Sequence, residues 1–271
     1  MLPYSDRPSA EEIVAAVPGL ASYARPAVIL VPERGEPAVR ESSIGGPLLW
    51  PVDEPWPHCS LPDEKGMEEG LDDELPASAM VPVVQVFKKD APGSWWPEGA
   101  DVFQLVWCPN VHDDPPAPHE DVSPVVEVRW RRAADVGDVL ATPPRPVRQE
   151  DEDFGFSPRP CTLTPVRLTD FPSPFELPET LVPAVERLVK ETGGEGSDVI
   201  TRVAGNKFGG WPSWGITDPY EFRCAVCDSV MPLLFTVASH DTTGITVGRW
   251  NDLRIFACPA DLGHGYRFDV G

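Results

Sequence analysis

The chain has 271 residues, enough for one large domain or two of ordinary size, and its 41% hydrophobic residues and nine tryptophans indicate a folded protein that needs no disulfides for stability. Its 43 acidic and 22 basic residues give a formal net charge of -21, which repels phosphate backbones and anionic lipids and argues against nucleic acid and membranes as partners. The N-terminus has no apolar leader and no run reaches the roughly 18 apolar residues of a membrane helix, so we expect a cytoplasmic protein with reduced cysteines.

One helix and a series of strands are expected in the first half of the chain. Ser9-Ala10-Glu11-Glu12 has the form of a capping box, so a short helix should begin there and run to Pro18-Gly19. Residues 27–31 are a short β-branched run bounded by prolines, which predicts a buried strand. Further strands are expected at 83–88, 101–108 and 125–130, an acidic solvated loop at 63–74 and a second loop at 113–118.

The second half is expected to follow a connector. Residues 142–160 contain five prolines and an acidic run, a composition that buries little apolar surface, so they should join a first half, 1–141, to a second half, 161–271. Residues 178–192 carry apolar positions at helical spacing and predict a helix whose regular part begins at Pro183 and which stops at Gly193-Gly194. Strands are expected at 164–168, 233–238, 253–258 and 266–270.

The two halves repeat the same order of residue types. Ser43-Ile44-Gly45-Gly46-Pro47 in the first half corresponds to Phe208-Gly209-Gly210-Trp211-Pro212 in the second. Each half then has a strand-like run after a Met, and closes with a Cys-Pro pair, Cys108-Pro109 and Cys258-Pro259. An internal duplication is the economical explanation, and it predicts an α+β fold, mostly antiparallel β, of two similar β-rich halves with a few short helices.

The second Gly-Gly element is predicted to form a corner. Its spacing matches neither of the glycine patterns that bind phosphate groups. Gly209 and Gly210 instead suit a positive φ or a close approach of two backbones, and Trp211-Pro212 favours an extended exit. Trp211 and Trp214 have two interpretations: they cover the edge of a β core, or they anchor a protein partner together with the two glycines.

A metal site is predicted in the second half. Cys224-x-x-Cys227, followed by Cys258 and His264, has the composition of a Cys3His zinc site in which two knuckles supply two ligands each. The alternative is that these are reduced cysteines of the core. A redox role is disfavoured, because the Cys-x-x-Cys pair leads into a strand and not into a helix N-terminus that would lower a thiol pKa. Zinc, in a structural role, is the cofactor that this pattern indicates.

The first half has a weaker version of the same pattern. Cys59, Cys108 and a nearby His112 are present without a second Cys-x-x-Cys, unless His58 supplies the missing ligand. The alternative is that Cys59 and Cys108 are reduced cysteines of the core. His112 and His119 stand singly in polar loops and are expected to be solvated. No nucleophile elbow occurs in the sequence, so no residue is predicted to be catalytic.

These elements together resemble two known families. The Gly-Gly elements of both halves, Trp56-Pro57, Val84-Gln85-Val86 and the Cys-x-x-Cys pair, over roughly residues 25–270, resemble the YwqG-like family of uncharacterised bacterial proteins. Residues 206–259 are also similar to the eukaryotic programmed cell death protein 2 family. The matching positions in this sequence are Lys207, Gly209, Gly210, Pro212, Trp214, Cys224, Cys227, Met231, Leu234, Val237, Phe256 and Cys258.

The resemblance implies a duplicated α+β architecture and no known catalysis. For the eukaryotic family it implies chaperoning of a basic ribosomal protein, and for some bacterial members it implies neutralisation of toxins. We therefore expect a non-catalytic, chaperone-like or adaptor protein that binds another protein, with the net charge of -21 favouring a basic one. The alternatives are a toxin-neutralising immunity protein and a zinc-dependent enzyme of unknown reaction.

Overall fold

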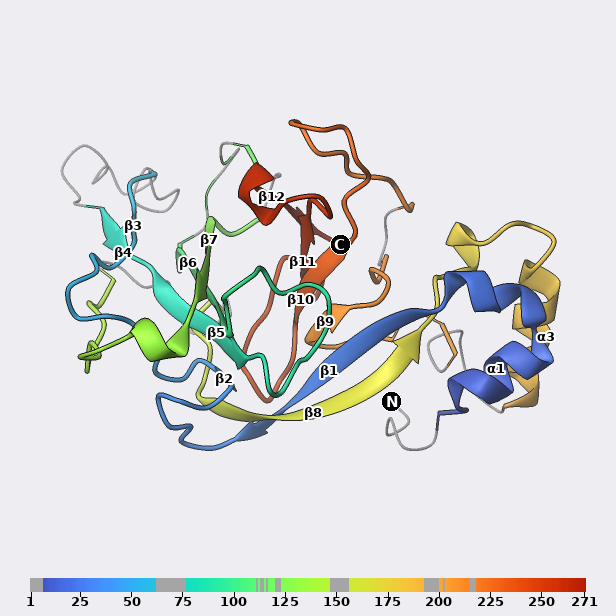
Figure 1. The fold of residues 1–271 in the computed structure, drawn as a ribbon, viewed down its shortest axis with the longest axis horizontal. Coiled ribbons are helices and arrows are strands. Elements are labelled where there is room, and N and C mark those ends of the chain that lie inside the picture. Colours follow the sequence, from blue (N-terminus) through green and yellow to red (C-terminus); the bar gives the residue numbers. More distant parts are fainter. Residues whose placement is uncertain are drawn as a thin grey trace.

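One antiparallel sheet of ten strands organises the protein (Figure 1). The computed structural model describes residues 7–61, 77–110, 112, 115, 117–119, 123–146, 156–192, 200–201, 203–214 and 218–271. The strands of the large sheet are β1 (Arg25–Arg34), β2 (Ser43–Ile44), β5 (Val81–Phe87), β6 (Val102–Trp107), β7 (Val126–Arg131), β8 (Cys161–Asp170), β9 (Lys207–Gly209), β10 (Leu233–Ala238), β11 (Asp252–Ala257) and β12 (Tyr266–Val270). Two further strands, β3 (His58–Cys59) and β4 (Ser78–Ala79), form a separate pair.

The strand order is β12-β11-β10-β9-β1-β8-β2-β5-β6-β7, and every neighbouring pair is antiparallel. At its centre β1 and β8 pair along their whole length, from Arg25 opposite Asp170 to Arg34 opposite Cys161. The two long strands exchange neighbours: β1 pairs next with β9, and β8 pairs next with β2. The predicted halves therefore share one sheet.

The two edges of the sheet approach each other, so the sheet is nearly closed. Trp130 Nε1 on β7 donates to the Tyr266 hydroxyl on β12 over 2.8 Å. Aromatic rings from strands on either side of the central β1 and β8 pair meet in the interior. Phe208 of β9 and Phe235 of β10 lie 5.1 and 5.2 Å, centre to centre, from Phe103 of β6. Burial of these rings is the main apolar contribution to the core.

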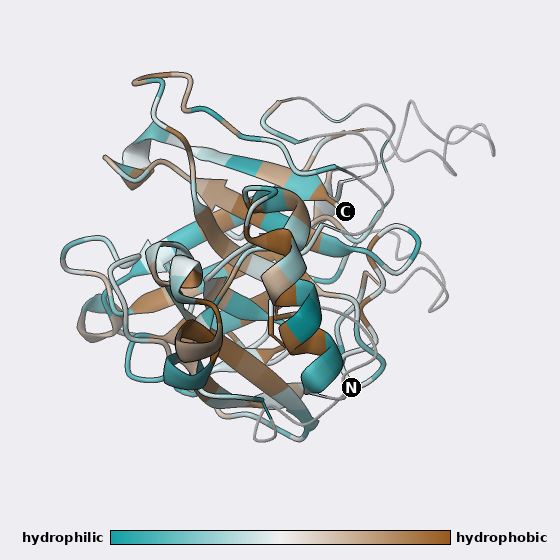
Figure 2. Ribbon diagram, turned by 90° about the vertical axis from the view of Figure 1, so that its right-hand side faces the viewer, coloured by the Kyte–Doolittle hydropathy of each residue, from teal (hydrophilic) through white to brown (hydrophobic). Residues whose placement is uncertain are grey.

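The helices gather at one end of the long β1 and β8 pair (Figure 1). Helix α1 (Ala10–Ala16), the 3-10 helix η2 (Pro18–Tyr23) and helix α3 (Val182–Glu191) pack around Ile13, Leu20, Phe171 and Val185. Figure 2 looks at this end and shows them in front of the sheet, with apolar and polar residues alternating along the helices. Short 3-10 turns occur at η3 (Ala133–Asp135), η5 (Pro174–Glu176) and η7 (Leu262–His264).

Local predictions from the sequence are confirmed over most of the chain. The capping box forms, with Ser9 Oγ accepting from Glu12 N over 3.2 Å and the Glu12 carboxylate accepting from Ser9 N over 2.8 Å. The predicted strands are all present, and α3 begins one residue before Pro183. The acidic loop 63–74, residues 113, 114 and 116 of the loop 113–118, Gly193-Gly194 and residues 147–155 of the connector lie outside the described residues.

The predicted class, mostly antiparallel β with few short helices, is confirmed. The internal duplication and the boundaries at 141 and 161 stay predictions. Among the helices that the structure describes, none has the length and apolar character needed to span a membrane.

A buried carboxylate fixes the Gly-Gly corner to the end of β8. Asp170 Oδ1 accepts from the backbone N–H groups of Phe171 and Val203 over 3.0 and 3.1 Å. Its Oδ2 accepts from Lys207 Nζ and from Trp211 N, each over 2.9 Å. The side chains of Asp170 and Lys207 are 0% and 1% exposed. Hydrogen bonds that satisfy the charge offset the cost of removing it from water.

The two glycines of the corner have the backbone conformation that the sequence predicted. Gly209 and Gly210 have φ of 66° and 72°, which residues with a Cβ adopt at a cost. A Cβ on Gly210 would lie 2.5 Å from Asp170 Oδ2, closer than the two atoms can come. Space as well as φ therefore requires glycine at position 210.

Substitution at Gly210 tests this close approach against backbone strain alone. Gly99 has φ of 79° with no atom within 4 Å of a Cβ, so Gly99→Ala should cost only the about 1–2 kcal/mol of the left-handed conformation. Gly210→Ala should lose about 1–3 kcal/mol more, because the methyl group must displace the carboxylate. Urea unfolding of both variants measures the difference, and equal losses would contradict the steric argument.

Removing either partner of the buried ion pair should destabilise the protein by unequal amounts. Lys207→Met should lower the free energy of unfolding by about 3 kcal/mol, because the carboxylate keeps its three backbone donors. Asp170→Leu should lower it further, since an ammonium and three N–H groups lose their acceptor. The control is Glu221→Gln in the exposed Glu221–Arg223 pair, at 3.3 Å, which should cost less than about 1 kcal/mol. Equal losses for the two buried substitutions would argue against the carboxylate as the hub.

Candidate metal centre and the adjoining groove

The Cys-x-x-Cys pair lies in a tight turn. Arg223 and Val230 form an isolated antiparallel bridge, and between them Cys224 N donates to Ser229 O while Asp228 N donates to Cys224 O, both over 2.9 Å. Asp228 closes the turn with φ of 56°. This geometry brings the thiols of positions 224 and 227 to one side of the turn, as the first knuckle of a zinc site requires.

The second pair of ligands is supplied by the end of β11 and a short helical turn. Cys258 directly follows β11, and His264 is the last residue of η7. The Asp261 carboxylate caps this turn by accepting from Gly263 N over 2.7 Å. Five residues separate the two ligands, and η7 at the end of this segment returns the imidazole to Cys258, so the spacing is compatible with a shared ion.

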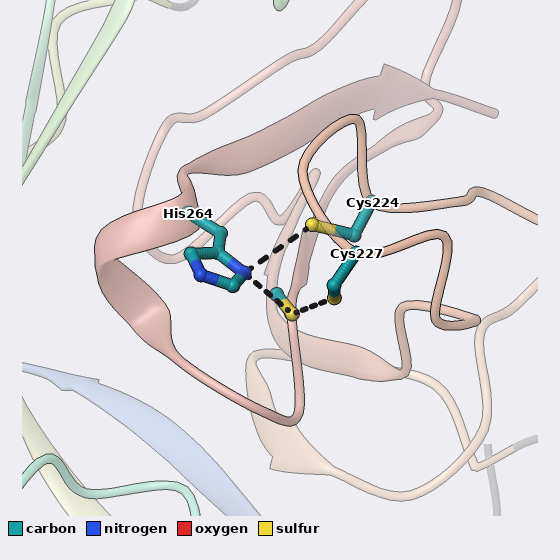
Figure 3. Close-up of side chains that lie close together, drawn as sticks. Cys224, Cys227 and His264 are labelled. Carbon is teal, nitrogen blue, oxygen red and sulfur yellow. Dashed lines mark hydrogen bonds between the residues drawn. The ribbon is translucent and has the colours of Figure 1, made fainter.

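The four predicted ligand atoms converge (Figure 3). His264 Nδ1 lies 3.6 Å from Cys224 Sγ and 3.4 Å from Cys258 Sγ, and Cys227 Sγ lies 3.4 Å from Cys258 Sγ. All four atoms lie within 4.8 Å of one another. Tetrahedral zinc, with bonds of about 2.3 Å to sulfur and about 2.1 Å to nitrogen, separates its ligand atoms by about 3.5–3.8 Å. The group Cys224, Cys227, Cys258 and His264 could therefore hold a metal ion.

Neighbouring groups orient these ligands. His264 directs Nδ1 at the sulfurs, and the Asp261 carboxylate lies 4.0 Å from its Nε2, beyond hydrogen-bond distance but on the side of the ring where a carboxylate often orients a metal-binding imidazole. Val226 N donates to Cys224 Sγ over 3.4 Å. Cys224 and Cys258 are buried against Trp214, Phe222 and Phe256, while Cys227 is exposed.

The thiols differ in how readily they ionise. The Ser229 hydroxyl, 3.3 Å from Cys227 Sγ, and its backbone amide hold the pKa of Cys227 at about 6, so this thiol is mainly thiolate at neutral pH. Desolvation raises the pKa of Cys258. The pKa of His264 is raised by hydrogen bonds to Cys227 and Cys224. At least one sulfur thus has the charge state that a metal requires before the ion arrives.

An open groove of about 1140 Å³ adjoins this centre. One wall is the 258–263 segment, and the opposite wall carries Trp95, Trp96 and Trp130. Trp95 stacks on Phe208 with 5.8 Å between ring centres, and Trp96 contacts Trp130 edge-on at 5.1 Å. The sequence predicted only a loop between β5 and β6 here; the Trp-Trp-Pro run within it was the signal of an aromatic wall.

The predicted partner-binding residues separate into two groups. Gly209 and Gly210 line the groove. Trp211 is half-buried, with the Arg25 guanidinium 3.3 Å above its ring and its Nε1 donating to Tyr23 O over 2.8 Å. Trp214 is 4% exposed, under the Arg254 guanidinium at 4.3 Å. Both tryptophan rings thus pack on the protein itself, and the role of the corner in partner binding stays a prediction.

The expectation that His112 and His119 are solvated is wrong. His112 is buried among the sulfurs of the first half. His119 stacks on Phe268 with 4.7 Å between ring centres and accepts from Val126 N over 2.9 Å. Both side chains contact residues distant in the chain, Cys59 for His112 and Phe268 for His119, and such contacts leave no signal in the local sequence.

No model of a known protein family matches the chain, and no curated protein matches it either. The resemblance to the YwqG-like and programmed cell death protein 2 families therefore rests on the motifs in the sequence.

Loss of one ligand should remove one metal ion per chain and destabilise the protein. Cys224→Ser should lower the metal content by about one ion and lower the melting temperature, because metal affinity is part of the folding free energy. The matched control is Cys161→Ser, a buried thiol outside this group, which should keep the metal. Elemental mass spectrometry and thermal unfolding of both variants measure the effect. If Cys224→Ser and Cys161→Ser contain the same amount of metal, Cys224, Cys227 and Cys258 are thiols of the core and not metal ligands.

Proposed function

We propose that the protein is a non-catalytic binding protein that accepts a segment of a basic partner protein in the groove between the tryptophan wall and the metal-binding knuckle. The groove is the observation that carries this proposal. Its volume of about 1140 Å³ exceeds the roughly 300–1000 Å³ of sites for small molecules. A peptide segment with two or three large side chains is a better match for an open groove of this size.

The groove offers the kind of surface that dominates binding energies. Trp95, Trp130 and Tyr266 are partly buried rings on its wall, held in place by packing and by the Trp130 to Tyr266 hydrogen bond. Rigid aromatic rings supply large contact area at little entropic cost. Gly209 also lets the aromatic wall pack closely on β9, because a Cβ at this position would lie 2.6 Å from the Trp95 ring.

Charge on the groove itself is nearly balanced. Arg131 forms an ion pair with Glu54, and Arg25 lies over the Trp211 ring. Among the other charged residues that line the groove, Arg132 is basic, and Glu98 and Asp261 are acidic. The remainder of the protein carries the excess of acidic residues, with a net charge of -21. Such a field attracts a basic partner over long range, while the aromatic groove supplies the contacts that keep it bound.

We assign a structural role to the metal centre, with zinc as its ion. Four protein ligands complete a tetrahedral shell, whereas a catalytic zinc keeps one position for water or substrate. The ligand Cys258 and the segment that follows it, through Gly263, form one wall of the groove. Zinc would therefore hold this wall in position, which favours the binding role over the alternative of a zinc-dependent enzyme.

We also infer that the protein arose by internal duplication. The strands β2-β5-β6-β7 lie on one side of the central β1 and β8 pair, and β9-β10-β11-β12 lie on the other side in the corresponding order. The exchange of neighbours between β1 and β8 is what a two-fold repeat with swapped first strands would produce. The recurrence of Gly-Gly and Cys-Pro at matching places in the two halves supports this origin.

Binding should have two separable components. Partners would be captured from the native cytosol and the best of them purified. Raising the salt from about 0.05 to 0.5 M shortens the Debye length from roughly 14 to 4 Å, so association with a basic partner should slow. Trp95→Ala should mainly speed dissociation, with a loss on the order of 2 kcal/mol.

The matched control is Trp250→Ala, because Trp250 is 56% exposed and lies outside the groove. It should leave both rates unchanged. Stopped-flow or surface-based kinetics measures them. Captured partners that are neutral or acidic, and whose binding is indifferent to salt and to Trp95, would contradict the proposal.

A further inference from the structure

A second group of metal-binding side chains lies in the first half of the chain. His112 Nε2 is 3.4 Å from Cys59 Sγ and 3.1 Å from Cys108 Sγ, and the three ligand atoms lie within 4.8 Å of one another. All three residues are buried. We propose that Cys59, Cys108 and His112 bind a second thiophilic metal ion, for which zinc is the natural probe. This proposal does not depend on the binding function of the groove.

The two contacts of His112 Nε2 with sulfur are explained better by a metal ion shared among the three residues than by hydrogen bonds. One imidazole nitrogen faces two sulfurs, yet as a donor it carries a single proton and as an acceptor a single lone pair. The separations from nitrogen to sulfur are close to the about 3.5 Å expected between two ligands of one zinc ion. A cation at the centre of the three atoms would satisfy all of them at once.

The surroundings make a cation useful. Cys59 and Cys108 belong to an apolar cluster with Leu48, Trp50 and Met80. A cysteine binds a metal ion as the thiolate. A thiolate in an apolar pocket is costly unless a positive charge accompanies it. A bound metal ion would supply that charge.

The place of this group in the sheet matches that of the first centre. Cys108 directly follows β6, and Cys258 directly follows β11; each of these strands is the second from an edge of the sheet. Both cysteines precede a proline, and each is followed within six residues by its histidine, 112 or 264. Two Cys-His groups thus stand at corresponding ends of corresponding strands.

The ligand set distinguishes the second site from the first. His58, which the sequence offered as a fourth ligand, does not join the group, since its Nδ1 lies 2.8 Å from Trp56 O. Among the described residues the site therefore has two sulfurs and one nitrogen. Two soft thiolates and an imidazole suit zinc with one exchangeable position, and they also suit three-coordinate copper(I). Parallel titrations with zinc and with copper(I) would identify the preferred ion.

The test removes the first centre and counts the metal that remains. Protein is purified under reducing conditions, equilibrated with zinc and desalted, and its metal is measured by elemental mass spectrometry. The wild type should hold about two ions per chain, and the double variant Cys224→Ser, Cys227→Ser about one. Adding Cys108→Ser should remove the last ion. Adding Cys161→Ser instead should not, because this buried thiol belongs to neither group.

A spectroscopic measurement keeps the test valid if Cys108→Ser fails to fold. Cobalt(II) added to the folded Cys224→Ser, Cys227→Ser variant should give a thiolate-to-cobalt charge-transfer band that saturates at about one equivalent. The proposal is overturned if this variant, folded by circular dichroism, holds no zinc and shows no such band. A Cys59–Cys108 disulfide in the reduced preparation would overturn it as well.

Discussion

The carboxylate of Asp170 is the interaction on which the rest of the structure depends. It receives hydrogen bonds from Lys207 Nζ and from three backbone N–H groups that belong to three separate stretches of chain. The three N–H groups have this carboxylate as their acceptor, whereas Lys207 Nζ donates also to Val203 O over 2.6 Å. The carboxylate joins the end of β8 to the start of β9 and to the Gly-Gly corner, at the point where the two halves meet. A buried charge of this kind specifies one arrangement of segments, because any other arrangement leaves it unpaired.

A second buried ion pair holds the other end of the same segment. The Arg254 side chain is 0% exposed and pairs with Asp269, and its Nη1 donates to Ser213 O over 2.8 Å. The guanidinium also covers the Trp214 ring. The segment 206–214 is thus fixed at Asp170 and again at Arg254, with the corner glycines turned to the groove between these points. The floor of the groove is rigid because both of its ends are tied to the core.

The two groups of cysteine and histidine residues that could hold a metal ion each include a residue that directly follows a strand, Cys108 after β6 and Cys258 after β11. A metal ion bound there would stabilise the loop after the strand, because metal affinity adds to the folding free energy. The group at the end of β11 forms part of the groove wall, so the shape of the groove depends on the stability of that loop.

The sequence by itself determined the local elements. The capping box at Ser9, the β-branched strand runs and the positive φ at Gly209 and Gly210 follow from interactions within a few residues, and all were predicted. The Cys-x-x-Cys turn and the Cys-Pro strand end were also recognisable as the two knuckles of one site, because ligand spacing is a local property. For Trp214 the sequence left two interpretations open, packing on the core and contact with a partner, because exposure depends on residues distant in the chain; the ring is 4% exposed.

Only the tertiary structure decided how these elements combine. The pairing of β1 with β8 and β9, and of β8 with β2, joins residues more than a hundred positions apart, and the cost of closing such loops has no signature in local sequence. The same is true of the groove: its tryptophans come from the loop after β5 and from β7, and its opposite wall from the loop after β11. Whether Asp170 and Arg254 are solvated or buried likewise depends on partners distant in the chain. Local propensity could place each strand, but the burial of charged groups and the meeting of distant loops are set by the closing of the whole sheet.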